Sequence, residues 1–236
     1  MSLQAGVGIS QGDDSYAVGA NACQDALDRV KMTDPSGLLV FSSVAYDQEK
    51  MLQGVRSVAP KATVVGCSTA GEITTDGPSK RHSVVVMALK GEAVSFYAGV
   101  GEDVAKGATE AGKAAADAVK LQAPDGKLDA FIMLPDVLAG NGADIVRGVL
   151  QSLGDHFPVV GGAAGDDFEF KKTYQYLNDK VYSGAVIGLG IQGNFKMGIG
   201  VKHGWIPIGL PKKVTKSSGA VLNELDGKPA IAIYED

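Results

Sequence analysis

The stretch Val64–Glu72 (VVGCSTAGE) decides the predicted fold, because a close variant, Val159–Asp167 (VVGGAAGDD), occurs later in the chain. Each copy begins with two valines, which favour a buried strand. Small residues follow, and each copy ends in an acidic residue. Small residues at the exit of a strand leave backbone N–H groups accessible, because no large side chain screens them. An acid beside such a turn can hold a cationic group. The combination suits a ligand that carries both a carboxylate and an ammonium.

The residues around the two stretches repeat in the same order. Apolar runs at Leu38–Phe41 and Asp129–Leu134 predict buried strands, and the pair Gly54-Val55 matches Gly148-Val149. Apolar residues at helical spacing predict four helices, at about 16–31, 48–58, 104–121 and 143–153. We therefore predict an internal duplication with repeats at about 1–101 and 102–203.

The predicted fold class is α/β, with two duplicated units that have mixed sheets and helices outside. Each unit has one sheet face that it cannot cover alone, so the units are expected to pack together. A four-layer α-β-β-α body satisfies this requirement. Two strand pairs, 82–89 with 93–100 and 184–191 with 195–202, are predicted to be hairpins, and 173–182 is predicted to add a third.

The composition excludes several functional classes. The chain has 236 residues, of which 45% are hydrophobic and 21% charged, as in a soluble globular protein. Its net charge is −5 and it has no run of Lys or Arg, which argues against nucleic-acid binding. The apolar run Val84–Leu89 is too short to cross a membrane, and the first residues do not resemble a signal peptide. We expect a cytoplasmic protein without membrane insertion.

The two cysteines, Cys23 and Cys67, form no CxxC pair and no Cys/His cluster, so we expect reduced thiols, no metal and no cofactor. The stretch Gly66–Gly71 resembles a nucleophile elbow, but its second glycine comes one residue too late. A catalytic Cys67 would need a neighbouring base, and no spacing ties a histidine to it. We therefore predict a non-enzymatic protein with no catalytic residues. A hydrolase or transferase that uses Cys67 or Ser68 is one alternative, and a protein-interaction scaffold is another.

The predicted ligand site combines both small-residue turns. In this hypothesis backbone N–H groups of one turn bind a carboxylate, and Glu72 or Asp166 binds an ammonium. Trp205, the one tryptophan, could line the same pocket. The simpler alternatives are that each acid accepts N–H groups of its own turn and that Trp205 seals a core edge. The candidate ligand-binding residues are Cys67, Ser68, Thr69, Gly71, Glu72, Gly161, Gly162, Ala163, Asp166 and Trp205.

These stretches, followed by Gly204–Pro207 (GWIP) and Leu222–Ala230 (LNELDGKPA), resemble the FIST domain in content and order. The resemblance implies an intracellular sensory module of signal-transduction proteins that binds small molecules, with amino acids as proposed ligands. It also implies an N-terminal portion, here residues 1–203, and a C-terminal portion that begins at 204–236 and is expected to be truncated. The implied partners are a small molecule and a signalling output domain or protein outside this chain.

Overall fold

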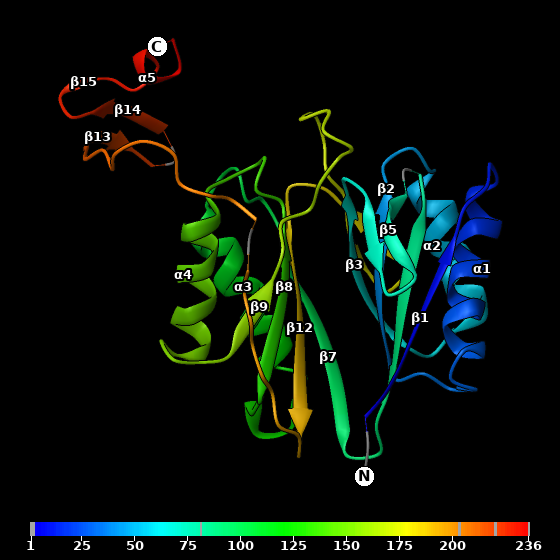
Figure 1. Ribbon diagram of the computed structural model, residues 1–236. Coiled ribbons are helices and arrows are strands. Elements are labelled where there is room, and N and C mark those ends of the chain that lie inside the picture. Colours follow the sequence, from blue (N-terminus) through cyan, green and yellow to red (C-terminus); the bar gives the residue numbers. More distant parts are fainter. Residues whose placement is uncertain (1–2, 81, 203, 220, 236) are drawn as a thin grey trace. The chain divides into compact units, whose positions relative to one another are not determined.

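The computed structural model describes residues 3–80, 82–202, 204–219 and 221–235 (Figure 1). The chain forms two compact units, Met1–Met197 and Gly198–Asp236. The predicted α/β class is confirmed, and the larger unit has the four layers α-β-β-α. Within the described residues, every helix is too short or too polar to cross a membrane.

The larger unit consists of two halves with the same element order. The first half contains β1 (Gln4–Ser10), α1 (Ser15–Asp28), β2 (Gly37–Ser43), α2 (Gln48–Val58), β3 (Thr63–Thr69), β4 (Glu72–Thr74), β5 (Gly77–Lys80) and β6 (Val84–Lys90). The second contains β7 (Val94–Gly101), α3 (Ala108–Lys120), the 3-10 turn η1 (Pro124–Gly126), β8 (Ala130–Pro135), α4 (Gly142–Leu153), β9 (Val159–Gly161), β10 (Gln175–Leu177), β11 (Lys180–Tyr182) and β12 (Val186–Gly193). The four predicted helices are therefore confirmed. Side-chain caps start three of them, because Asp14, Asp47 and Asn141 accept N–H groups of the first turn.

The duplication is visible in the strand order of the two main sheets. One sheet has the order β1-β6-β2-β3-β10-β11, and the other has the order β7-β12-β8-β9. In each sheet the first three strands of these orders pair antiparallel, and β2–β3 and β8–β9 pair parallel. Strands β1, β6, β2 and β3 are thus the topological equivalents of β7, β12, β8 and β9. The hairpin β10–β11 extends only the first of the two sheets.

Two of the three predicted hairpins are wrong. Strands β6 and β7 are joined by a short turn but lie in different sheets, since β6 pairs with β1 and β2 whereas β7 pairs with β12. After β12, residues 195–202 form no strand. The physical reason is that β6 and β12 are central strands, buried on both faces, so each takes partners from distant segments. The third prediction is confirmed, because β10 and β11 pair antiparallel.

Three apolar cores lie between the four layers. The central core joins the two sheets through residues such as Leu39, Val65, Ile187 and Leu189. A second core lies between α1, α2 and the first sheet, and a third lies between α3, α4 and the second sheet. Figure 1 shows the corresponding arrangement, with α1 and α2 outside one sheet and α3 and α4 outside the other.

Each helix pair packs closely through a pair of glycines. A Cβ on Gly54 of α2 would lie 2.0 Å from the Tyr16 backbone oxygen of α1, and one on Gly148 of α4 would lie 1.9 Å from the Thr109 oxygen of α3. The opposite helices have the matching glycines, Gly19 of α1 and Gly112 of α3. The same contact in both halves explains why the sequence repeats Gly54-Val55 as Gly148-Val149.

The smaller unit is a short three-stranded antiparallel sheet, β13 (Val214–Ser218), β14 (Val221–Leu225) and β15 (Lys228–Pro229), followed by α5 (Ala232–Glu235). Asp226 closes the turn after β14, since its carboxylate accepts the N–H of Lys213 and its own N–H donates to the Lys213 oxygen.

Because of the close glycine contact, we expect a glycine-to-alanine substitution in α4 to destabilise the protein, the opposite of its usual effect in a helix. Alanine normally stabilises a helix by about 1 kcal/mol relative to glycine. Gly148→Ala should instead lower the free energy of unfolding by about 1–3 kcal/mol, because its methyl group would force α3 and α4 apart. Urea unfolding measures the difference. Gly142→Ala in the same helix is the matched control, since its Cβ would meet its nearest neighbour at 3.4 Å. Equal stabilisation by both substitutions would contradict the close contact.

Candidate functional site

The two small-residue turns lie in direct contact. The Gly165 N–H donates to the Ser68 oxygen at 2.8 Å, and the Asp167 N–H donates to the Thr69 oxygen at 3.2 Å. The approach is so close that a Cβ on Gly165 would lie 2.9 Å from the Ala70 nitrogen. The second turn therefore crosses from its own sheet to the end of β3 in the other sheet. We call residues 162–174, which connect β9 to β10, the crossover segment.

Ser68 fastens the crossover segment to β3. Its hydroxyl donates to the Gly165 oxygen at 2.6 Å and accepts the Tyr174 N–H at 2.8 Å. Its backbone N–H also donates to the Tyr174 oxygen at 2.8 Å. The side chain is fully buried. The fold thus uses the Ser68 N–H, which belongs to the turn that the sequence analysis assigned to a ligand carboxylate, and also the Ser68 hydroxyl.

Cys67 points into the central core between the two sheets. Burial raises the pKa of its thiol to about 12, and burial raises the pKa of the Cys23 thiol to about 12 as well. At neutral pH both are therefore thiols rather than nucleophilic thiolates.

Glu72 is buried behind the contact between the turns, with 4% of its surface exposed. Its carboxylate accepts the hydroxyls of Thr69 and Ser83. Burial raises the pKa of Glu72, and the negative charge of Asp167 raises it further, against the opposing effect of the two hydroxyl donors. Glu72 is consequently a carboxyl group inside the fold, adjacent to the crossover segment.

Asp166 shapes the crossover segment. Its carboxylate accepts the N–H groups of Phe170, Lys171 and Lys172 at 3.0, 2.6 and 3.1 Å. Desolvation opposes ionisation of Asp166, but these backbone donors outweigh it and lower its pKa. This contact is the simpler alternative that the sequence analysis described, in which the acid accepts N–H groups of its own turn.

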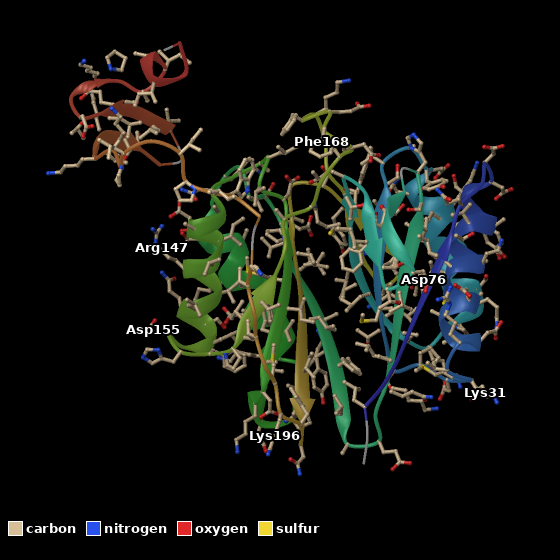
Figure 2. All side chains as sticks on the ribbon, in the orientation of Figure 1. Lys31, Asp76, Arg147, Asp155, Phe168 and Lys196 are labelled. Atoms are coloured by element: carbon tan, nitrogen blue, oxygen red, sulfur yellow. The ribbon has the colours of Figure 1, made fainter. Side chains whose placement is uncertain are left out.

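The loop that Asp166 holds has an unusual backbone. Asp167, Phe168 and Phe170 all have positive φ, at 55°, 66° and 54°, a conformation that bulky residues rarely adopt. Phe168 and Phe170 are 71% and 74% exposed. Figure 2 shows Phe168 on a loop that projects beyond the ends of the strands. Such strain persists only where the surrounding contacts enforce it, and it occurs frequently at ligand-binding segments.

A hollow of about 300 Å³ lies beside this loop, where β2 ends. We call it the β2-end hollow. It contains carboxylates, amines and an imidazole, and is lined by Val44, Ala45, His82, Asp166, Asp167, Glu169, Lys171, Lys172 and Tyr174. Ser43, the last residue of β2, donates its hydroxyl to Asp167 Oδ2 at 2.6 Å and lies 3.2 Å from His82 Nδ1. Lys172 Nζ lies 4.8 Å from the centre of the Tyr174 ring.

The predicted ligand residues are distributed over three places. Ser68, Thr69, Gly71, Glu72 and Asp166 lie at or near the contact between the turns, and Cys67 lies in the core beside it. Gly161, Gly162 and Ala163 line a second hollow beside α4. Trp205 belongs to the smaller unit and is 85% exposed.

The sequence analysis missed Ser43, His82, Asp167 and Lys172 as residues of one site. One signal could have indicated Ser43, because it follows the buried strand Leu38–Phe41, and ligands of α/β sheets bind at the carboxyl ends of parallel strands. The other three come from loops that meet only through the crossover between the sheets.

A comparison with known protein families shows which family this chain belongs to. The FIST N domain family matches residues 37–228. The chain belongs to the FIST family. FIST domains are sensory domains of signal-transduction proteins, as the sequence resemblance implied.

Two individual proteins are also similar to this FIST domain. An uncharacterized protein of Methanocaldococcus jannaschii is 30% identical over 210 residues, which cover 84% of this chain and 40% of the relative. The chain thus spans well under half the length of that relative. The crystal structure of a cyanuric acid hydrolase from A. caulinodans aligns with a TM-score of 0.39 and 11% identity, over 83% of this chain and 72% of the hydrolase. A likeness of this size carries no argument about activity.

The buried thiols should resist modification. With a pKa of about 12, roughly one Cys67 thiol in 10,000 is ionised at pH 8. We expect an aromatic disulfide reagent to react with neither Cys67 nor Cys23 in the folded protein and with both in guanidinium chloride, as followed by absorbance. Fast, selective labelling of Cys67 in the folded protein would instead indicate an activated thiol.

Glu72 should make stability depend on pH. Because its pKa is raised in the folded state, folding favours the protonated carboxyl, and this stability is lost as the pH rises from below 4.5 through the raised pKa. Glu72→Gln cannot ionise, so the free energy of unfolding of the wild type relative to this variant should fall over that pH range. Urea unfolding at a series of pH values measures the change. Ser83→Ala removes one donor to the carboxylate and so raises the pKa of Glu72 further, which should make the total fall in the free energy of unfolding larger than in the wild type. A difference that is constant with pH would contradict the burial of an ionisable Glu72.

Proposed function

We propose that this FIST domain is a non-enzymatic sensor that binds a small zwitterion, such as an amino acid, in the β2-end hollow. The observation that carries the proposal is that carboxylates and amines line the same hollow, beside a strained loop. Its volume of about 300 Å³ is at the lower end of the range for ligand pockets, roughly 300–1,000 Å³. This size suits a molecule no larger than an amino acid.

The charges offer partners for both ends of a zwitterion. The Ser43 hydroxyl orients Asp167, which makes its carboxylate a preorganised acceptor for an ammonium. Lys172, held over the Tyr174 ring, supplies a cation for a carboxylate. His82, whose Nδ1 lies 3.2 Å from Ser43 Oγ, adds a further polar group to the lining. This proposed binding mode differs from the hypothesis drawn from the sequence, because Asp167 takes the place of Glu72 and Asp166 as the group that binds the ammonium.

Ligand binding would act on the crossover segment. A zwitterion bridging Asp167 and Lys172 would connect the two ends of the loop that carries the exposed Phe168 and Phe170. Three residues of this loop have positive φ, so its conformation is strained, and a ligand that favours a different conformation of the loop would shift the population. The exposed aromatic rings are then the surface through which an output domain or protein reads the change.

The buried positions of Cys67 and Ser68 support a non-enzymatic role. Ser68 uses its hydroxyl to fasten Gly165 and Tyr174, and the pKa of Cys67 is raised by burial to about 12. The proximity of Ser43 Oγ to His82 Nδ1 is a feature that favours a hydrolase instead. However, Ser43 is fully buried and directs its proton to Asp167, so its oxygen is poorly placed to attack a substrate.

A thermal-shift screen of the twenty amino acids, followed by calorimetry, tests the proposal. A ligand present at 100 times its Kd should stabilise the protein by about 2.7 kcal/mol. Asp167→Asn and Lys172→Ala should each weaken binding by about tenfold or more, because each removes a charge-assisted hydrogen bond.

Lys106→Ala is the matched control for the loss of a lysine, because Lys106 is exposed and pairs with Asp103 away from this hollow. It should leave the affinity unchanged. A screen in which none of the amino acids shifts the unfolding temperature of the wild type would contradict the proposed ligand class.

A further inference from the structure

A second hollow lies along the outer side of the β8–β9 edge, between β9 and α4. We call it the β9 groove. It has a volume of about 480 Å³ and a mainly apolar lining, formed by Met133, Pro135, Val137, Gly142, Val146, Leu150, Asp155, Phe157, Val159, Val160, Gly161, Gly162 and Ala163. In Figure 2 the labelled Arg147 lies on α4, and the labelled Asp155 lies just after the end of this helix.

The strand at the base of the groove ends its sheet. Among the strands of the described residues, β9 pairs on one side only, with β8, whereas its equivalent β3 pairs with β10 on the corresponding side. An exposed strand edge is a template for pairing with another strand. The first half of the same molecule thus shows that the equivalent edge, that of β3, pairs with an additional antiparallel strand, β10.

The equivalent space in the first half is filled by a tyrosine. Strand β10 pairs antiparallel with β3, with Tyr176 opposite Gly66. Tyr176 is fully buried in the core between α2 and the sheet, and a Cβ on Gly66 would lie 2.8 Å from its ring. Its hydroxyl donates to Gln48 Oε1, on the first residue of α2. A glycine in the strand and a polar group at the start of the helix therefore define the position of the ring.

The β9 groove repeats this frame without the ring. Gly161 pairs with Met133 of β8 as Gly66 pairs with Val40 of β2. Both glycines lie so close to the neighbouring strand that a Cβ would meet its backbone oxygen at 1.9 and 2.1 Å. At the start of α4, Gly142 occupies the place of Gln48. Both Gly142 and Gly161 line the groove.

We propose that the β9 groove binds an extended segment of a partner protein, which pairs antiparallel with β9 and inserts an aromatic side chain over Gly161. The backbone of β9 supplies hydrogen bonds, and the space between α4 and β9 supplies an apolar pocket. This inference is independent of the proposed zwitterion site, because the two hollows share no lining residue.

The helix facing the groove further defines the partner. In the first half, Arg56 of α2 binds Asp179 in the turn of the β10–β11 hairpin, with Nε at 2.7 Å from Oδ1. The residue in the same place on α4, two positions after the shared glycine, is Leu150. The partner segment is therefore expected to place an apolar residue at this point, where β10–β11 has an acid.

The peptide KTYQYLNDKVYS, which has the sequence of residues 172–183, is a probe for this site. In trans it should shift the backbone amide signals of β9 and the first turn of α4 in a ¹H–¹⁵N correlation spectrum of the full chain. The peptide with the Tyr176→Ala substitution should bind at least tenfold more weakly, because it cannot bury an aromatic ring in the groove.

A gain of affinity gives the sharpest test. Gly142→Gln restores the acceptor that Gln48 provides for Tyr176, so it should tighten binding of the tyrosine peptide about two- to tenfold, the value of one net hydrogen bond. The same substitution should not change the affinity for the alanine peptide. Gly142 lies at the first position of α4, and its Cβ would have room, so the variant is expected to fold.

A blocking variant and its control complete the experiment. Gly162→Trp should abolish peptide binding, because Gly162 lines the groove. A Cβ at this position meets no atom within 4 Å, so the variant is expected to fold. Asp28→Trp, at an exposed position on α1 in the other half, should leave binding unchanged.

The proposal is overturned if the tyrosine peptide shifts no signals at millimolar concentration, shifts signals away from β9 and α4, or binds as tightly as the alanine peptide. It is also overturned if sedimentation shows that the chain alone dimerises and Gly162→Trp abolishes the dimer, since the occupant would then be a second copy.

Discussion

The hydrogen bonds that Ser68 makes to the crossover segment support the rest of the larger unit. They carry the chain from the end of β9 in one sheet to the edge of β3 in the other. This crossing places Asp167 and Lys172 beside the end of β2, which forms the β2-end hollow. It also delivers β10 to the edge of β3 and leaves β9 without an equivalent neighbour. The hydroxyl and backbone bonds of Ser68, together with the pairing of β10 with β3, hold the segment that forms the candidate ligand site and that makes the two halves unequal.

The duplicated α/β fold was predictable because its constraints are local and occur twice. Glycines 54 and 148 recur at the same place in each helix pair, where backbone contact excludes any side chain. The strand pairing was less predictable. Strands such as β6 and β12 are buried on both faces, so apolar and polar residues do not alternate along them. Without this alternation, the sequence does not indicate whether such a strand pairs with the next strand in the chain or with a distant one. A short turn between β6 and β7 consequently suggested a pairing that the two sheets do not make.

The candidate site was only partly predictable. The small residues of the two turns were recognised, and the structure brings these turns together, but the packing itself requires their smallness. Gly165 has no side chain because Ala70 lies against it, and Ser68 is buried because it fastens the crossover segment. Ser43 ends β2, whereas His82 and Lys172 come from two separate loops, and only the tertiary fold brings the three near one another. A pattern of small residues therefore indicates where the backbone is crowded, and a ligand site need not coincide with it.

The hairpin β10–β11 has a consequence for the way the larger unit folds. It belongs by sequence to the second half and by pairing to the first, so the first sheet is completed only after the second half has been synthesised. Contacts between such distant segments slow folding, because a long loop must close before they form. The halves, although descended from one pattern, should behave as one cooperative folding unit. A cut between them would leave Tyr176 without its pocket and expose the apolar faces that now meet in the central core.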